Sequence, residues 1–310
     1  MLSAGWGIAA GFYGRGRAGF ILPGSMTVRP MRDEDIPGVH EAMLAAFGDL
    51  DRRLGDPYPG PQPQLAQSTV RFRRTLATDP GGCWVAERDG GVAGAAVGIV
   101  REGVWGLSMF VVRPDAQGAG LGRALLERAA GHGARARGRI VLASRDPRAI
   151  AAYARLGLDL HPSVSALGRP RGVRAPAEVR EGGPADLPMT EAIDRAVRGA
   201  AHGDDLLAML AAGSTLLVLE DRGYALVLGG HVRLLAATDE PAAQAVLRAA
   251  LARTEASGGS ATVEWITARQ GWAVRPCLEA GLELSTSAGP VFTGGDVGPF
   301  APYLPSGAYL

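Results

Sequence analysis

The 310-residue sequence contains no Lys and no Asn, so every positively charged side chain, histidine apart, is an arginine. A Walker-type phosphate loop needs a Lys after its last glycine, and the absence of Lys excludes it. Cysteine is also scarce, because Cys83 and Cys277 are the only two and they form no CxxC pair. Neither a disulfide framework nor a zinc site is predicted, and a reducing, cytoplasmic location is expected.

Long apolar runs are missing as well. No run reaches the roughly 18 residues that a membrane span requires, so a membrane partner is not expected. Residues 1–25 are rich in glycine but lack the basic start, continuous apolar stretch and cleavage site of a signal peptide. Met26 directly precedes a strand-like segment, and residues 1–25 are therefore expected to be a tail or to lie upstream of the true start.

Arginine is scarce in the second half of the chain, so the two halves differ in net charge. Residues 1–175 hold 23 Arg and 15 acidic residues, whereas residues 176–310 hold 9 Arg and 16 acidic residues. A basic first half suits an anionic small ligand, and the opposite charges could also hold the halves together. Aromatic residues make up 6% of the chain and do not interleave with the arginines, so nucleic acid is not expected as a partner.

An internal repeat is present. Val, Arg, Asp and Pro recur at matching positions in residues 28–37 and 179–188, at an offset of 151. Near the end of each copy, residues 156–160 are echoed by residues 280–284 at an offset of 124, so the second copy is shorter. Repeats of this length indicate two related structural units.

The repeat and the chain length together predict two domains, since about 100 to 200 residues per domain is usual. Residues 166–178 are rich in Gly, Pro and Arg and show no hydrophobic periodicity, which is typical of a linker. We expect domains over residues 26–167 and 178–310, with a linker over residues 168–177.

Hydrophobic periodicity predicts an α/β (α+β) fold in which each domain has a mixed, largely antiparallel sheet flanked by helices. In the first domain, strands are expected at residues 27–30, 83–87, 91–100, 105–112, 139–143 and from Leu158, and helices at residues 33–47, 65–78, after Gly122 and at 147–156. In the second domain, strands are expected at residues 215–220, 224–228, 231–237 and 261–267, and helices at 241–256 and 271–280. The Pro- and Gly-rich segment Gly55–Gln64 is expected to be a loop that could form a lid.

The turn Gln117-Gly118-Ala119-Gly120-Leu121-Gly122 joins a strand to a helix. Unpaired N–H groups and a partial positive charge at a helix N-terminus bind anions, and glycines let a pyrophosphate approach the backbone. A Rossmann fingerprint needs GxGxxG, whereas these glycines form GxGxG after a meander of strands. Asp146 nevertheless lies at a suitable distance for a ribose contact, so a nucleotide-dependent oxidoreductase stays open as an alternative.

This turn resembles the signature of the GNAT superfamily of acyl-CoA N-acyltransferases. The resemblance extends to the flanking segments Met109–Pro114, Arg123–Leu126 and Ala149–Leu158, and residues 27–165 resemble one complete GNAT domain. It implies a tandem GNAT protein that transfers an acyl group, most often acetyl, from acyl-CoA to a primary amine by direct attack in a ternary complex. The acceptor would be a small molecule or a peptide, and no metal is implied.

The resemblance also implies a set of donor-binding residues. The strand over 107–112 would splay from its neighbour, and Val111 and Val112 would contact the pantetheine arm. The pyrophosphate would lie on backbone N–H groups of Gln117, Gly118, Ala119, Gly120, Leu121, Gly122 and Arg123. Asp146 stands where the family often has Asn, three residues before Ala149, and a carboxylate there can accept hydrogen bonds but not donate them.

Tyr153 matches the tyrosine by which the family protonates the departing thiolate. The alternative is that Tyr153 packs under the cofactor without a chemical role. The strand 106–112 contains no carboxylate that could serve as a general base. Four residues remain as candidates for the base, each with a surface or structural role as the favoured reading: Glu102, His161, His40 and Glu41.

The second copy has no glycine turn. Its strand meets its helix through Thr238-Asp239-Glu240-Pro241, where two carboxylates would satisfy the helix dipole and repel phosphate. We therefore expect the second domain to be a degenerate GNAT domain that does not bind CoA and that shapes the acceptor pocket or the surface of a homodimer. A non-catalytic acyl-CoA-binding or scaffold protein is the main alternative, favoured by the missing carboxylate and by Asp146.

Overall fold

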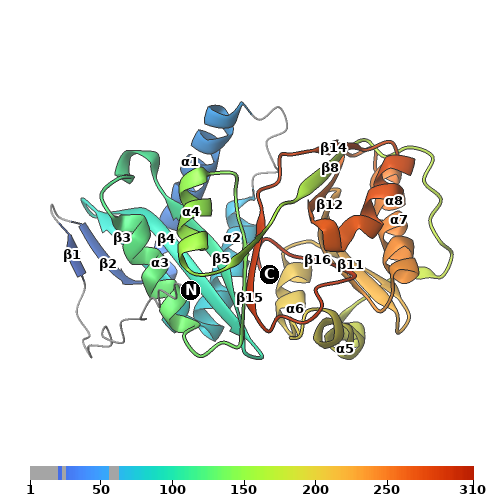
Figure 1. Cartoon of the computed structure of the whole chain (residues 1–310), viewed down its shortest axis with the longest axis horizontal. Coiled ribbons are helices and arrows are strands. Elements are labelled where there is room, and N and C mark those ends of the chain that lie inside the picture. The colour runs from blue at the N-terminus through green and yellow to red at the C-terminus, as the bar shows by residue number, and fades with distance from the viewer. Residues whose placement is uncertain (1–19, 23–25, 56–62) are drawn as a thin grey trace, which may run out of the picture.

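The structure is a computed structural model that describes residues 20–22, 26–55 and 63–310. Most of the expected N-terminal tail, residues 1–25, and most of the expected lid, Gly55–Gln64, lie outside the described residues. Within the described part, two sheets lie side by side and helices pack against both of them (Figure 1). The fold class expected from hydrophobic periodicity is therefore confirmed.

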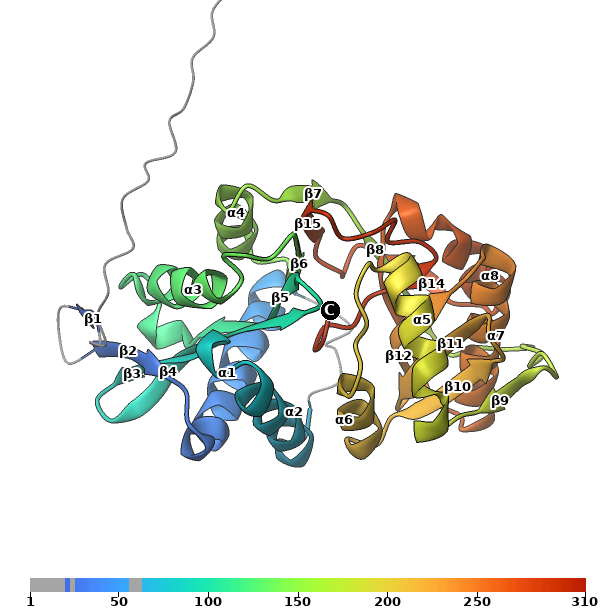
Figure 2. The ribbon, with the colours of Figure 1, turned by 90° about the horizontal axis from the view of Figure 1, so that it is seen from below.

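The first half of the chain begins with two strands and two helices and continues into a meander of three strands. Its elements are β1 (Phe20–Leu22), β2 (Met26–Pro30), α1 (Ile36–Leu54), α2 (Leu65–Thr78), β3 (Cys83–Arg88), β4 (Gly91–Arg101), β5 (Val104–Val112), α3 (Leu121–His132), β6 (Gly138–Leu142), α4 (Pro147–Arg155), β7 (Asp159–His161) and β8 (Val164–Gly168). Figure 2 shows α3 and α4 on one face of this sheet and α1 and α2 on the other.

The second half repeats this plan with shorter connections. Its elements are β9 (Val179–Glu181), α5 (Leu187–Val197), α6 (Asp205–Ala211), β10 (Thr215–Leu219), β11 (Gly223–Leu228), β12 (His231–Ala237), α7 (Glu240–Ala256), β13 (Ala261–Ile266), α8 (Val274–Glu279), β14 (Glu283–Ser285), β15 (Val291–Gly295) and β16 (Tyr303–Leu304).

Turn chemistry explains where two of the expected elements end. The β3–β4 hairpin turns at Asp89 and Gly90, whose φ angles of 53° and 79° are those of a tight hairpin turn. Helix α1 extends past the expected end near Phe47 to Leu54, since a single glycine at position 48 weakens a helix without ending it. Gly55 stops the helix in a left-handed conformation, with φ of 61°.

The two sheets exchange strands. In the first sheet the order is β1-β2-β3-β4-β5-β6-β15-β7, so β15 from the end of the chain lies between two strands of the first half. In the second sheet the order is β14-β8-β13-β12-β11-β10-β9, so β8 from the first half lies between two strands of the second. The sheets therefore do not divide at the expected boundary of residues 167 and 168, because each half supplies a strand to the other.

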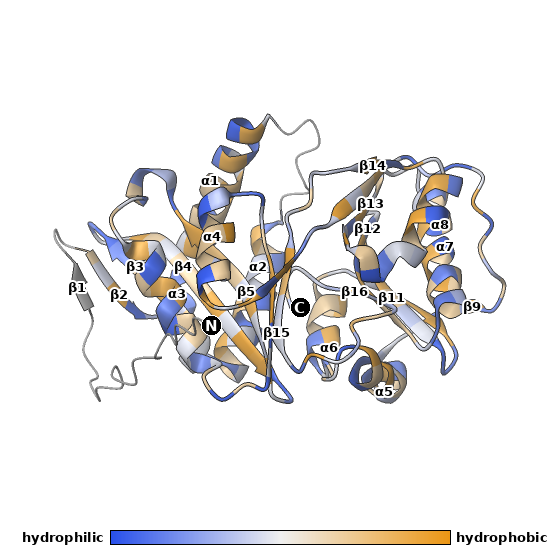
Figure 3. Ribbon diagram, viewed as in Figure 1, coloured by the Kyte–Doolittle hydropathy of each residue, from blue (hydrophilic) through white to orange (hydrophobic). Residues whose placement is uncertain are grey.

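Three apolar clusters hold the layers together. Figure 3 marks the hydrophobic residues of the strands and helices in orange. One lies between the first sheet and helices α3 and α4, and a second lies between the second sheet and helices α7 and α8. The third runs without interruption from α1 and α2 through both sheets to the last residues of the chain. Burial of apolar surface thus joins the halves as well as stabilising each one.

Candidate active site

The parallel strands β5 and β6 pair at only one end and then separate. Their register extends from Val104 opposite Gly138 to Gly106 opposite Ile140, and no strand among the described residues pairs with the rest of β5 on that side. The Arg113 N–H donates to the Ala93 carbonyl of β4, and backbone groups alternate in direction along a strand. Phe110 and Val112 therefore turn their backbone groups to the open side, whereas Val111 turns its groups to β4.

The glycine turn follows this open edge and begins α3. Gly118 and Gly120 have φ angles of 85° and 82°, a left-handed conformation that residues with a side chain adopt at a cost of about 1–2 kcal/mol. The first helical hydrogen bond runs from the Ala124 N–H to the Gly120 carbonyl, at 3.1 Å. The N–H groups of residues 121–123 precede that bond, so they are free to hold an anion.

Gln117 ties the turn to the strand. Its amide nitrogen donates to the Val112 carbonyl at 2.9 Å, and its amide oxygen accepts from Arg148 of α4 at 2.6 Å. The turn, the open strand and α4 are thus held together by one side chain. Arg148 is a feature that sequence reasoning missed, although its place just after the N-cap of α4 is visible in the sequence.

Asp146 caps α4 and does not stand free. It accepts the Arg148 N–H at 2.9 Å and also binds the guanidinium groups of Arg148 and Arg53, at 2.7 and 3.3 Å. Its hydrogen bond with the Arg148 side chain is the main reason that its pKa is lowered to about 2. Two arginines therefore offset the carboxylate that stands where the family often has an amide.

The remaining residues of the expected donor site lie around the start of α3 and α4. Leu121 is buried, and a Cβ on Gly122 would lie 3.4 Å from the Phe110 ring, so Gly122 lets the helix pack closely on β5. The Arg123 side chain is 85% exposed and pairs with Glu127 at 2.7 Å, which leaves its backbone N–H as the group available to a ligand. Ala149 is half-buried in α4.

Tyr153 lies on α4 and faces the open edge of β5. It is 4% exposed, and its ring packs edge-on against Phe110 of β5 and Phe292 of β15, with centroids 6.2 and 5.6 Å apart. Burial raises the pKa of its phenol, so the hydroxyl keeps its proton throughout the physiological range. Phe292 comes from the strand that the second half supplies, so the second half helps to position Tyr153.

Two of the four candidate bases, Glu102 and His40, make contacts that give them a structural role. Glu102 lies at the β4–β5 turn, where Arg195 of α5 binds it at 2.7 Å and the Ala201 N–H donates to it. His40 lies in α1 with its ring nitrogen 2.9 Å from the Ser68 hydroxyl. Both pairs join neighbouring elements.

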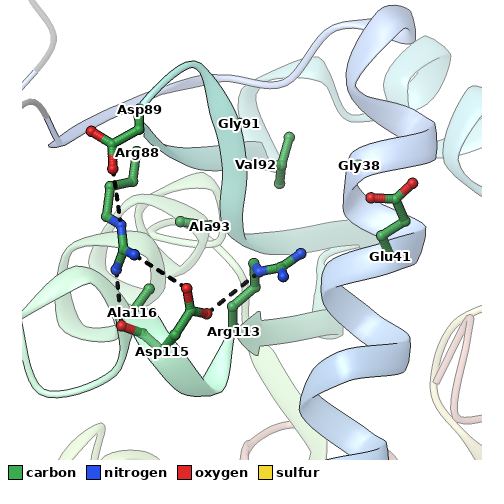
Figure 4. A pocket seen from close by; sticks show the side chains of 10 residues that line it. All are labelled: Gly38, Glu41, Arg88, Asp89, Gly91, Val92, Ala93, Arg113, Asp115 and Ala116. Atoms are coloured by element: carbon green, nitrogen blue, oxygen red, sulfur yellow. Dashed lines mark hydrogen bonds and ion pairs between the residues drawn. The ribbon is translucent and has the colours of Figure 1, made fainter.

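Glu41 lines a surface pocket beside the β3–β4 turn (Figure 4). In that pocket Arg88 and Arg113 pair with Asp115, at 3.2 and 3.5 Å. Tyr153 is not among the residues that line this pocket.

His161 is the fourth candidate and lies at the end of β7. Its ring nitrogen is 2.8 Å from the Thr293 hydroxyl of β15, next to Phe292. Burial and the nearby Arg269 lower the pKa of its imidazole, so it is predominantly neutral at neutral pH.

The second half has a helix in the place of α3, but its N-terminus is already occupied. Asp239 caps α7 by accepting the Ala242 N–H at 2.8 Å, and Arg222 pairs with Asp239 at 2.9 Å. The N–H groups that hold an anion in other sites are therefore engaged by the chain itself, as expected from the residues at this turn.

The open strand edge of the second half is also filled. Strands β12 and β13 pair in parallel only at His231 and Thr262. Beyond that point β16 pairs with β12, with Tyr303 opposite Ala236 and Leu304 opposite Leu235. The end of the chain thus lies against the strand edge that corresponds to the open edge of β5.

No helix in the described part of the chain is long and apolar enough to cross a membrane. Among the same residues, no group of three or more His, Cys, Asp or Glu side chains could hold a metal ion.

Comparison with known proteins agrees with this geometry. Residues 47–158 match the acetyltransferase (GNAT) family. The matched segment includes the glycine turn, α3 and Tyr153, and proteins of that family use acyl-CoA as the donor. No curated protein matches the sequence.

Solved structures extend the likeness to the whole chain. A putative acetyltransferase from Pyrococcus horikoshii is 18% identical with a TM-score of 0.74, over 96% of this chain and all of the other. A GCN5-related N-acetyltransferase from Sphaerobacter thermophilus is 16% identical with a TM-score of 0.57, over 89% of this chain and 97% of the other. A tandem GNAT protein from the clavulanic acid biosynthesis pathway is 14% identical with a TM-score of 0.54, over 87% of this chain and 98% of the other. The chain has the tandem GNAT fold, and family and fold together support N-acetyltransferase activity.

Proposed function

We propose that this protein transfers an acyl group, in the first instance acetyl, from acyl-CoA to a primary amine, and that its first half alone binds the donor. The observation that carries the proposal is the open edge of β5 leading directly to the free N–H groups at the start of α3. An extended pantetheine arm can add to such an edge as a strand would, and a pyrophosphate fits the helix N-terminus.

The donor contacts follow from the direction of the backbone groups. Phe110 and Val112 face the open side, so we expect the arm to bond to Phe110 instead of Val111. The Val112 carbonyl already accepts from Gln117, which leaves its N–H for the arm. The N–H groups of residues 118–123 would hold the pyrophosphate, and Arg148 stands beside them.

The proposed reaction is a direct attack in a ternary complex. The amine nitrogen bonds to the thioester carbonyl carbon, the carbon–sulfur bond breaks, and the departing thiolate takes a proton from the Tyr153 hydroxyl. The proton lost by the amine passes to a base or to water. Of the four candidates, His161 is bound to Thr293, next to the Phe292 ring that packs on Tyr153, and its lowered pKa keeps the imidazole in the neutral form that accepts a proton.

A screen for thiol release across amines tests the proposal. Acetyl-CoA plus a suitable amine should release CoA in proportion to the acetylated product, and the initial rates should follow a sequential pattern. A ping-pong pattern would contradict direct attack. Binding of acetyl-CoA without thiol release from any amine would instead support the alternative of a non-catalytic acyl-CoA-binding protein, which the absence of a carboxylate from residues 106–112 favours.

A further inference from the structure

Two arginines from different halves both interact electrostatically with Tyr309, near the end of the chain. Arg71 comes from α2, and Arg233 comes from β12. Arg233 occupies a bulge, because Val232 pairs with Val227 and Leu234 pairs with Leu226, so Arg233 has no partner across the strands. A bulge redirects a side chain, and here the Arg233 side chain lies within electrostatic reach of Arg71 and Tyr309.

Both guanidinium groups have donors that the protein does not use. Arg71 donates to the hydroxyl of Ser108 at 2.9 Å and to the Ser108 carbonyl, but its Nε is buried without a partner. Arg233 makes no hydrogen bond or ion pair with any residue that the structure describes. A buried charged group whose donors lack acceptors is costly in free energy. A bound ligand that supplied acceptors would remove this cost.

Other buried arginines of this chain are fully engaged. Arg101 pairs with Asp79 and Asp205, at 2.7 and 2.5 Å. Arg198 donates to the carbonyls of Ala200 and Leu310. The fold therefore supplies acceptors to Arg101 and Arg198, whereas donors of Arg71 and Arg233 remain without a partner among the described residues.

The surroundings of the two arginines carry a net positive charge. Burial lowers the pKa of Arg233, and it lowers the pKa of Arg71 to about 10, an effect that the charge of Arg233 increases. Both remain cations at neutral pH. Burial opposes ionisation of Glu264 on β13, but His231 and Arg233 lower its pKa on balance, so this carboxylate is charged. Two cations thus face one carboxylate.

The arginines also lie next to the strand that would present the thioester. Ser108, which Arg71 binds, occupies the β5 bulge, since Leu107 pairs with Gly98 and Met109 with Val97. Phe110, two residues later, begins the open edge. Arg71 and Arg233 are both partly buried residues. A molecule that filled their unused donors would lie beside the proposed donor site.

We infer that Arg71 and Arg233 form an anion clamp between the two halves that binds the carboxylate of the acceptor, and that the acceptor is a small amino-carboxylate. The inference rests on the proposed function and adds the chemical class of the substrate. Two guanidinium groups opposed by Glu264 leave about one positive charge, which matches a carboxylate better than a phosphate of about −2. A carboxylate held at the clamp would leave the amine of the same molecule to reach the donor.

Matched acceptors test the clamp. Amino acids, their amides and the corresponding decarboxylated amines should be compared as acceptors. Acetyl-CoA is the donor in every assay. The acid should have a KM at least about tenfold below that of its amide, since a charge-assisted pair is worth roughly 1.5–3 kcal/mol. Equal KM values, or a stronger preference for aminoalkyl phosphates, would overturn the assignment.

The variant Arg233→Gln separates a ligand site from a structural role. It should raise the KM for the acid about tenfold or more. The KM for the amide and the Kd for acetyl-CoA should stay unchanged. Because Arg233 has no hydrogen bond or ion pair to lose, and the cost of burying its charge offsets its attraction to Glu264, the Tm of the variant should stay close to that of the wild type. Arg275→Gln, an exposed arginine paired with Glu279, is the matched control and should change neither KM. A lowered Tm with an unchanged acid-to-amide ratio would contradict the clamp.

A binding measurement keeps the clamp testable if no amine is acetylated. Wild-type protein with CoA present should gain thermal stability from added amino-carboxylates, and Arg233→Gln should lose that gain. Failure of turnover alone would reject the proposed function, whereas absence of this stabilisation in the wild type would reject the clamp.

Discussion

The N-termini of α3 and α7 occupy corresponding places in the two halves and differ in what satisfies them. At α3, two glycines with positive φ leave the first N–H groups free, and β5 has an open edge. At α7, Asp239 accepts from the first turn, and β16 covers the corresponding edge of β12. The same fold can thus leave the proposed donor site open or fill it with its own chain. The difference depends on a few residues at the turn before the helix and on the short strand β16.

The two halves also differ in the residue at the position of Tyr153. At the offset of 124 residues that relates the ends of the two copies, Tyr153 matches Cys277 in α8. Burial raises the pKa of the Cys277 thiol to about 12, and the side chain is fully enclosed. The second half therefore lacks the proposed proton donor as well as the donor site.

The largest effect is expected from Tyr153→Phe. If the phenol protonates the leaving thiolate, kcat should fall roughly 10²–10⁴-fold, with the Kd for acetyl-CoA unchanged. Cys277→Ala at the corresponding position of the second half should leave kcat unchanged. An unaltered kcat in Tyr153→Phe at saturating acetyl-CoA would reduce Tyr153 to a packing role.

Gly120→Asp gives α3 the N-cap residue of α7. The carboxylate would satisfy the helix N-terminus and repel the pyrophosphate, and the positive φ of Gly120 adds strain, so the Kd for acetyl-CoA should rise roughly 100-fold. Gly120→Ala adds the strain without the charge and should raise the Kd only about fivefold. Equal effects of the two variants in calorimetry would show that charge at this helix end does not decide donor binding.

Phe292→Leu tests what the exchanged strand contributes. Phe292 is fully buried and packs on Tyr153 from a strand that belongs to the second half. Its replacement should lower the free energy of unfolding by about 1–3 kcal/mol, through lost contacts and altered shape. It should also lower kcat more than it weakens donor binding. Denaturant unfolding and steady-state kinetics measure the two effects, and a kcat equal to that of the wild type would show that β15 does not position Tyr153.

The smallest effect is expected from Asp239→Ala. Loss of this N-cap should reduce the free energy of unfolding by about 1 kcal/mol. Donor binding should not change, because β16 still covers the edge of β12 and no glycine turn is formed. Chemical unfolding followed by circular dichroism gives the stability change, and any gain of acetyl-CoA binding would mean that Asp239 alone had blocked a second site.

The sequence was sufficient for features that depend on neighbouring residues. The β3–β4 turn and the limits of α2 follow from local residue preferences, and the repeat indicated two related folds. The free N-terminus of α3 and the capped N-terminus of α7 could likewise be inferred from the residues at each turn.

Features that depend on long-range pairing could not be read in this way. Strand β15 pairs with β6 and β7 from far along the chain, and nothing in its own residues states which sheet it joins. The same holds for β16, and for Arg71 and Arg233, which lie far apart in the sequence and approach only when the halves pack. The direction of the backbone at Val111 likewise required the register of β4 and β5.

The central claim is that only the first half binds the donor, and calorimetric titration of the whole chain with acetyl-CoA tests it most directly. The account predicts about one equivalent bound per chain, with that binding weakened by Gly120→Asp and unaffected by Asp239→Ala. Two equivalents per chain, or one equivalent that persists at full affinity in Gly120→Asp, would contradict it.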